Sequence, residues 1–327
     1  MKVFPQGSFR PPASFNSIED SLIIHKHDGS QNNRHLVIFV HGLGGRRYGD
    51  NSTWGFFPTF IFEDFPKYDI GLYAFRSAFG RMKFWRSVPV DREAQVLADT
   101  IKTLIRNNTY DFVVLIGHSL GGLLCKGAVS CLFNSQRRNF PVSDIVMMAT
   151  PQLGSLRVPG FLRWLTTDAR VLRAHSDFIE KLVIDFQTKF HCTIDPPLDD
   201  KVHLRIWSVV AAADFWVDPL SAGIGVMESQ KLTVSGGHTE IVKPDDKNSD
   251  AYIFVHSCLK EALKPRPVLF RTENCRPTEY SELSDLHDFA SQFFSEPISN
   301  LRTMQDWWKV NDTIFQTIER ISKSNGR

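Results

Sequence analysis

Ser119 stands between two glycines in the segment GHSLG, at residues 117–121. A serine hydroxyl becomes a nucleophile when a base accepts its proton, and that base works best when an acid orients it. Small residues must flank such a serine on a sharp turn between a strand and a helix, because the turn is crowded. The apolar run VVLI precedes the segment and GLLCKGAVS follows it. The sequence therefore predicts a strand, a turn that carries Ser119 as nucleophile, and a helix. The competing interpretation is a glycine-rich turn that only packs the helix on the sheet.

Candidates for the acid and the base follow Ser119 in the chain order serine, acid, histidine. In IWSVVAAADFWVDPLSA, Asp214 directly follows an apolar run, whereas Asp218 precedes Pro219 and is compatible with the start of a turn. We favour Asp214 as the acid and keep Asp218 as the alternative. Of the eleven histidines, His238 lies beyond the acid, in the glycine loop of SGGHTEIVKP, and is the predicted base.

The other histidines are expected to do other work. We expect His118 to support the turn beside the nucleophile and His256 to lie on the last helix of the sheet domain. The remaining histidines considered, which we expect to be solvated, are His25, His27, His175 and His191.

Acyl transfer also needs donors for the oxyanion that forms on the carbonyl, and backbone N–H groups usually serve. We expect one donor from Leu120, directly after the nucleophile, and the other from Leu43 in FVHGLGG, where glycines let the backbone turn inward. The chain has no G-x-x-x-x-G-K-[ST] segment, and GLGGRR lacks the dinucleotide-binding spacing.

Two aromatic segments, TWGFFPTFIF and VPGFLRWL, follow the first glycine loop and open the later irregular region. Apolar pockets are lined by such side chains. The candidate substrate-binding residues are Trp54, Phe161 and Trp164, although the same spacings suit a buried core.

The elements that must position these residues alternate between strand and helix. Apolar, β-branched runs predict strands at 35–40, 69–75, 111–117 and 143–150, and an amphipathic stripe predicts a helix near 91–108. This alternation predicts an α/β fold with a mostly parallel central sheet covered by helices on both faces. Residues 152–200 interrupt the pattern and predict inserted, lid-like helices; a helix capped near Ser52 is also expected.

The chain changes character at Pro265. We predict one domain at residues 1–265, and a linker with a helical C-terminal extension at 266–327. We expect two amphipathic helices in the extension, which would fold back on the domain, dimerise or bind a partner protein. If they bind a partner, the domain would be one module of a larger assembly.

Composition narrows the class of protein. The net charge of +2, with both signs mixed, does not favour nucleic acid as a partner. The five cysteines show no C-x-x-C spacing, which argues against a metal site or a disulfide framework and favours a reduced, cytoplasmic location. No apolar run is long enough to span a bilayer, although contact with a membrane surface remains compatible with the sequence.

The segments HGLGG, GHSLGG, MATPQLGS, AADFWV and HTEIVKP together resemble α/β-hydrolases of the lipase and serine-esterase type. More narrowly, they are similar to the intracellular group of GPI inositol-deacylase-like and serine-active-site lipase-like proteins, over about residues 20–265. Gln152 stands where that group usually has histidine. The resemblance favours Asp214 over Asp218, because the acid of the group stands three residues before a valine, here Val217.

The resemblance implies the α/β-hydrolase fold, ester hydrolysis, and neither metal nor cofactor. With the aromatic segments, it leads us to expect a carboxylic-ester hydrolase acting on an acyl-lipid or another apolar ester. The same three residues would also suit a thioesterase or protein deacylase.

Overall fold

The structure is a computed structural model. It describes residues 21–27, 35–49, 52–75, 89–107, 110–136, 140–154, 176–195 and 201–264. The expectations for Phe161, Trp164, His175 and the C-terminal extension lie outside these ranges.

A seven-stranded sheet forms the centre of the described fold, in the order β1-β3-β2-β4-β5-β8-β9. Strand β1 runs antiparallel to β3, and every other neighbouring pair is parallel. A separate parallel pair joins β6 to β7, which the sequence did not predict. The strands are β1 (Leu22–His25), β2 (His35–Val40), β3 (Tyr68–Tyr73), β4 (Phe112–His118), β5 (Val142–Met148), β6 (Phe190–His191), β7 (Val202–His203), β8 (Arg205–Ala211) and β9 (Lys231–Val234).

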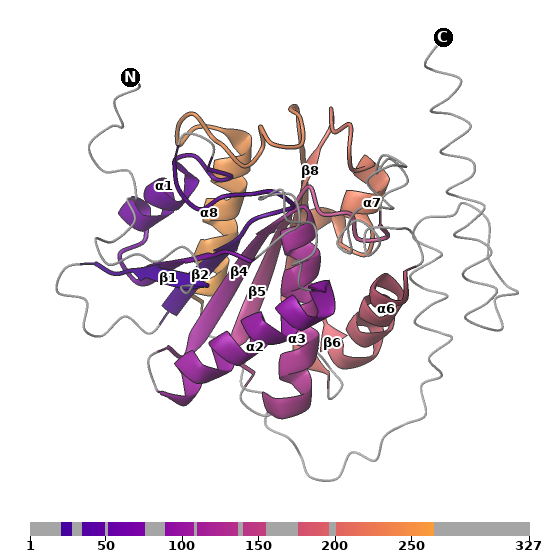
Figure 1. The fold of residues 1–327 in the computed structure, drawn as a ribbon. Helices are drawn as coiled ribbons and strands as arrows, with labels where there is room; N and C mark the ends of the chain where they lie inside the picture. Colours follow the sequence, from indigo (N-terminus) through magenta and orange to yellow (C-terminus); the bar gives the residue numbers. More distant parts are fainter. Residues whose placement is uncertain are drawn as a thin grey trace, which may run out of the picture. The chain divides into compact units, whose positions relative to one another are not determined.

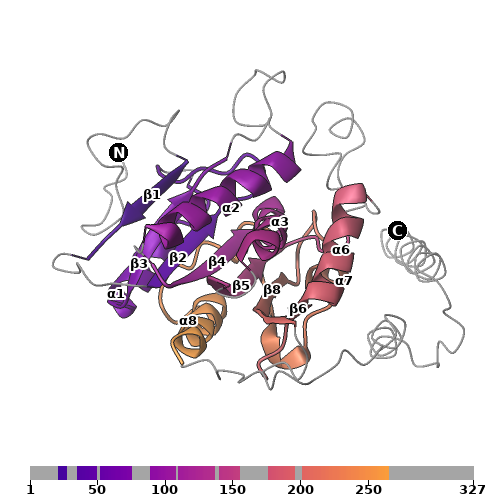
Figure 2. The same ribbon diagram turned by 90° about the horizontal axis from the view of Figure 1, so that it is seen from below.

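Helices cover both faces of this sheet, as the sequence predicted. Helices α2, α3 and α6 lie on one face, and α1 and α8 on the other (Figures 1 and 2). Within the described ranges, no helix is both long and apolar enough to cross a lipid bilayer. The helices are α1 (Phe57–Asp64), α2 (Val90–Arg106), α3 (Leu120–Gln136), α6 (Asp177–Lys189), α7 (Pro219–Gly223) and α8 (Asp250–Ala262), with a 3-10 turn at Glu228–Gln230.

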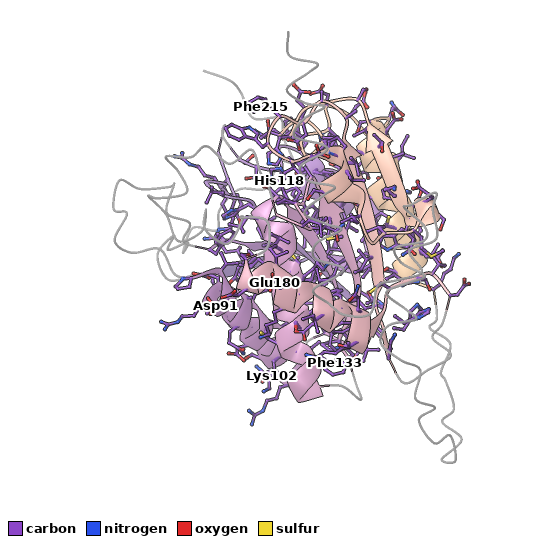
Figure 3. The ribbon with its side chains drawn as sticks, turned by 90° about the vertical axis from the view of Figure 1, so that its right-hand side faces the viewer. Asp91, Lys102, His118, Phe133, Glu180 and Phe215 are labelled. Atoms are coloured by element: carbon purple, nitrogen blue, oxygen red, sulfur yellow. The ribbon has the colours of Figure 1, made fainter. Side chains whose placement is uncertain are left out.

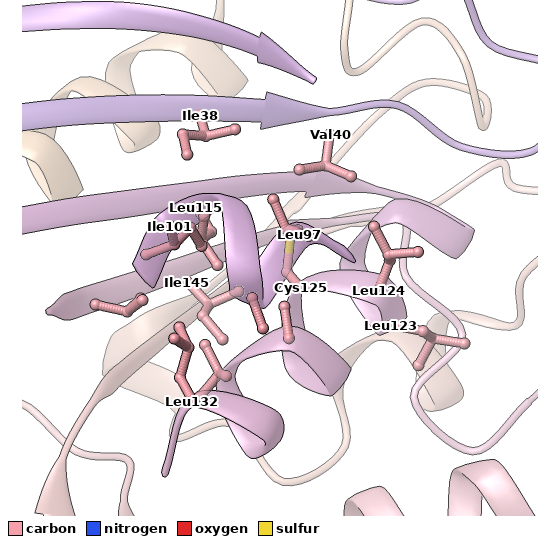
Figure 4. Packing of buried hydrophobic residues seen from close by; sticks show 14 of the residues in the cluster. Ile38, Val40, Leu97, Ile101, Leu115, Leu123, Leu124, Cys125, Leu132 and Ile145 are labelled. Carbon is pink, nitrogen blue, oxygen red and sulfur yellow. The ribbon is translucent and has the colours of Figure 1, made fainter. Parts of the chain in front are cut away.

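Strand β2 shows why its apolar run is continuous. Successive side chains of a strand point to opposite faces, so Ile38 and Val40 pack with α2 and α3, whereas Val37 and Phe39 pack with α1 and α8. Figure 4 shows the first of these layers, where Ile38 and Val40 face Leu97 of α2. Because both faces are buried, neither set of positions can be polar, and the strand is held in the middle of the sheet.

The start of α1 differs from expectation. The helix begins at Phe57, not near Ser52, and its N-cap residue Phe56 makes no capping hydrogen bond through its side chain. Pro58 stands in the first turn, where its fixed φ suits a helix and its missing N–H costs nothing. Ser52 instead donates its backbone N–H to Gly49 in a turn before the helix.

Lys126 is a buried cation in the layer between α3 and α6. Its Nζ donates to Oε1 of Gln152 at 3.3 Å and lies 4.4 Å from the ring centroid of Phe186. Neither neighbour carries a negative charge, and burial lowers the pKa of Lys126 from 10.5 to about 8. The folded protein therefore resists protonation of this amine, whereas the unfolded chain does not.

We expect Lys126→Met to raise the free energy of unfolding by about 2 kcal/mol at pH 7, after allowance for the lost hydrogen bond. The folded pKa lies below the unfolded pKa, so the cost of Lys126 is complete below pH 8 and disappears as the pH rises toward 10.5. Urea unfolding at pH 7 and pH 9.5 should show a smaller gain at the higher pH. Lys260→Met, on the exposed side of α8, is the matched control. An equal gain at both pH values would contradict this account.

Candidate active site

Ser119 occupies a strained turn between β4 and α3. Its φ is +53°, in the left-handed region that residues other than glycine rarely adopt. The backbone N–H of Ser119 donates to the carbonyl of Met148, at the end of β5, over 2.9 Å. Strain of this kind costs about 1–3 kcal/mol and gathers at functional sites. The turn therefore holds the serine at the carboxyl edge of the sheet, where α/β sheets collect their reactive groups.

Close packing explains the glycines around this serine. A Cβ on Gly121 would lie 2.2 Å from the carbonyl oxygen of Val40, and one on Gly117 would lie 2.5 Å from Cα of Gly122. Gly122 is itself confined, because a Cβ there would lie 2.0 Å from Oγ1 of Thr150. The expected need for small neighbours is confirmed, and it extends to one more residue than the five-residue motif contains.

Asp214 and His238 are brought together from two loops. Oδ2 of Asp214 lies 2.7 Å from Nδ1 of His238. The other carboxylate oxygen, Oδ1, accepts the backbone N–H groups of Trp216 at 2.8 Å and Val217 at 2.9 Å. The carboxylate is buried and fixed on both sides. It can therefore orient the imidazole and stabilise a positive charge on it.

Asp218, the alternative acid, has a different role in the structure. Its side chain accepts the backbone N–H of Leu220 at 2.9 Å and caps the short helix α7. The sequence interpretation of Asp218 as the start of a turn is confirmed.

The loop that carries His238 is held at its backbone as well as at its ring. Ala213 donates its N–H to the carbonyl of Gly236 at 3.0 Å, and Gly236 has a φ of +147°, which favours glycine. Nε2 of His118 lies 2.9 Å from the carbonyl oxygen of His238, and the two ring centroids are 4.7 Å apart. These contacts bring His238 against His118, the residue that precedes Ser119.

The loop after β2 lies against Ser119. Gly45 donates its N–H to the carbonyl of Gly42 at 3.1 Å, which closes a turn in which Gly44 has a φ of +70°. A Cβ on Gly42 would lie 2.9 Å from Cβ of Ser119. Leu43 is therefore within this adjoining turn. Leu120 is the first residue of α3, where backbone N–H groups have no acceptor within the helix.

His41 holds the same loop through a hydrogen bond and a ring contact. Its Nδ1 lies 2.8 Å from the carbonyl oxygen of Gly42, and its ring stacks on Phe75 with centroids 4.8 Å apart. Burial lowers the pKa of His41 to about 4. The imidazole is thus neutral near pH 7, with Nδ1–H as the donor to Gly42.

Trp54, which we expected to bind substrate, is buried in the core. Its side chain is only 2% exposed and packs edge-on against Phe39, with ring centroids 5.0 Å apart. It also meets the ring of His118, with centroids 6.2 Å apart. The indole ring belongs to the core layer that α1 and α8 cover. Burial of such a large aromatic ring stabilises the fold around the site.

Two features of the site were missed by the sequence interpretation. Ala149, which follows β5, has a φ of +47°, and no residue type in its neighbourhood signals that strain. Phe215 and Trp216, directly after Asp214, are 68% and 45% exposed and pack edge to face, with centroids 5.4 Å apart. Figure 3 shows Phe215 at the same end of the molecule as His118. The letters FW after Asp214 were a visible signal for this exposed pair.

Two solved structures with TM-scores above 0.5 agree with this geometry at the level of the fold. The phospholipase PlaB from Legionella pneumophila is 17% identical, with a TM-score of 0.52 over 69% of this chain and 59% of PlaB. The propeptide form of lipase BlEst2 from Bacillus licheniformis is 13% identical, with a TM-score of 0.52 over 77% of this chain and 55% of BlEst2. PlaB in complex with thio-NAD is 20% identical, with a TM-score of 0.41 over 54% of this chain and 37% of that protein.

In all three comparisons the chain covers less than two thirds of the other protein. No curated protein matches the chain. The profile of the alpha/beta hydrolase family matches residues 37–247, which span β2 to the loop after His238. The mostly parallel sheet of the described fold and this match agree: the chain belongs to the alpha/beta hydrolase family.

Proposed function

We propose that this protein is a serine hydrolase that cleaves carboxylic esters through an acyl-enzyme on Ser119. The observation that carries the proposal is the 2.7 Å contact between Asp214 and His238, with His238 in turn contacting the residue before Ser119, whose φ is +53°. A buried acid, an oriented imidazole and a strained serine at the carboxyl edge of the sheet are the parts that acyl transfer needs.

The proposed chemistry follows from the tautomer that the acid selects. Nδ1–H of His238 donates to Asp214, which leaves Nε2 unprotonated and able to accept the proton of Ser119 Oγ as the oxygen attacks the ester carbonyl. The N–H groups of Leu43 and Leu120 are the proposed donors to the oxyanion. The imidazolium then protonates the leaving alkoxide, and water repeats the sequence to release the acid and regenerate Ser119.

The exposed aromatic pair supports an apolar ester, such as an acyl-lipid, as substrate. Phe215 and Trp216 follow the acid directly and are largely exposed. Exposed aromatic side chains beside a reactive site favour contact with apolar ligands or with a lipid surface, where tryptophan is enriched. We therefore place the contact with lipid at this loop.

A fluorophosphonate probe tests the proposal without knowledge of the natural substrate. We expect the purified protein to form one covalent adduct, which mass spectrometry of its peptides should locate on Ser119. A panel of p-nitrophenyl esters, phospholipids and acyl-CoA thioesters should then show ester cleavage. Preference for the thioesters would replace the ester proposal with the thioesterase alternative, and an adduct on another residue would overturn the mechanism.

We expect Phe215→Ser to lower kcat/KM for a long-chain ester in micelles about 10-fold, because an exposed aromatic ring contributes about 1–2 kcal/mol to apolar contact. Hydrolysis of a short, water-soluble ester should change less than 2-fold, since Asp214 keeps its backbone donors from Trp216 and Val217. Ile253→Ser, which removes a similarly exposed apolar side chain from α8, is the matched control. Equal losses on both substrates would show that the substitution disturbs the acid and not substrate contact.

A further inference from the structure

His118 connects the nucleophile turn to the loop that carries the base. It precedes Ser119 in the chain, and its Nε2 lies 2.9 Å from the carbonyl oxygen of His238. A carbonyl oxygen only accepts hydrogen bonds, so Nε2 of His118 carries the hydrogen. One end of this contact is thus covalently next to the proposed nucleophile, and the other end is the backbone of the proposed base.

The surroundings of His118 keep its ring neutral and in one orientation. Burial is the main cause that lowers the pKa of His118 to about 3, and the neighbouring His238 lowers it further. Nδ1 of His118 is buried without a hydrogen-bond partner among the described residues. Trp54 meets the ring edge-on, and a Cβ on Gly42 would lie 3.2 Å from Nδ1. The ring is buried and packs against these neighbours.

The hydrogen bond between Asp214 and His238 holds one end of the imidazole. It fixes Nδ1 of His238 at 2.7 Å from Oδ2 of Asp214, while the backbone bond from Ala213 to Gly236 holds the loop two residues before the histidine. The contact from His118 adds a second anchor, at the carbonyl of the same residue. These two contacts, one at the ring and one at the carbonyl of His238, together restrict where Nε2 of His238 can lie.

We propose that His118 is a positioning residue, which sets the distance between the nucleophile and the base by holding the carbonyl of His238. This inference rests on the proposed function, because it concerns the proton transfer from Ser119 to His238. The neutral ring of His118 serves the same step, because a cation at residue 118 would oppose the positive charge that His238 gains when it accepts the proton.

The test compares His118→Leu, which removes the donor, with His118→Gln, whose amide N–H can reach the same carbonyl. We expect His118→Leu to lower the rate of fluorophosphonate labelling and kcat for a soluble ester about 10²-fold, as misplacement by about 1 Å does, with KM changed less than 3-fold. His118→Gln should restore most of the labelling rate and of kcat.

Circular dichroism and thermal unfolding of each variant show the folded fraction, and His256→Leu on α8 reports what a histidine-to-leucine change does away from the site. Wild-type labelling rates in His118→Leu would overturn the inference and leave the proposed function intact. A fall in kcat that glutamine does not rescue, or a KM that rises as much as kcat falls, would also overturn it. If the wild-type protein is not labelled at Ser119, the proposed function fails, and the inference fails with it.

Discussion

Ser119→Ala should lower kcat for ester hydrolysis by about 10⁶-fold and abolish labelling by fluorophosphonate. The substitution removes one oxygen atom, which is the atom that carries the acyl group in the proposed mechanism. Alanine experiences the same steric cost at a φ of +53° as serine, so the turn and the backbone contact to Met148 should persist. Binding of substrate should change little, because the remaining parts of the site are retained. Initial rates on a p-nitrophenyl ester and intact-mass measurement after labelling give the two readouts.

Ser257→Ala provides the matched control for this substitution. Ser257 lies on the exposed side of α8, where its hydroxyl donates to the carbonyl of Ile253 at 2.9 Å. Its loss should leave hydrolysis and labelling unchanged. Activity retained in Ser119→Ala, at the level of the wild-type protein, would remove the proposed mechanism altogether.

The sheet was predictable because the residue types within each strand show that both faces of the strand are buried. Continuous apolar runs, such as residues 35–40, are possible only where helices cover both faces, and the structure confirms this. The start of α1 was not predictable from the same signal. Ser52 looked like a cap, but Pro58 and the packing of Phe57 set the boundary, and tertiary packing overrides local capping preference.

The contact between Asp214 and His238 was predictable because both residues follow strands whose carboxyl ends meet at one edge of the sheet. Strand β8 leads to Asp214 and β9 leads to His238, and β8 and β9 are neighbours. The contact from His118 to His238 joins residues 120 positions apart through a side chain and a carbonyl, and no pattern of residue types records such a contact. Trp54 was assigned to the substrate for a related reason, since composition does not distinguish a buried aromatic from one that lines a pocket.

Asp214→Asn should lower kcat by about 10⁴-fold while the fold is preserved. The structure gives the reason in the unequal surroundings of the two carboxylate oxygens. Oδ1 accepts two backbone N–H groups, from Trp216 and Val217, so the asparagine carbonyl must occupy that position. The amide NH₂ then faces Nδ1 of His238 and donates to it. Nδ1 becomes an acceptor, the ring hydrogen moves to Nε2, and the base can no longer take the proton of Ser119.

Asp218→Asn is the matched control, because it makes the same chemical change four residues away. Asparagine caps a helix about as well as aspartate does, so α7 should keep its start at Pro219. We expect wild-type kcat in this variant, and the direct comparison decides which of the two carboxylates orients the base. Asp214→Asn with more than a tenth of wild-type activity would contradict the tautomer argument, and a large loss in Asp218→Asn would return Asp218 to the role of acid. Proton NMR of the His238 ring, which should show the Nδ1 hydrogen in the wild-type protein and lose it in Asp214→Asn, tests the tautomer independently of turnover.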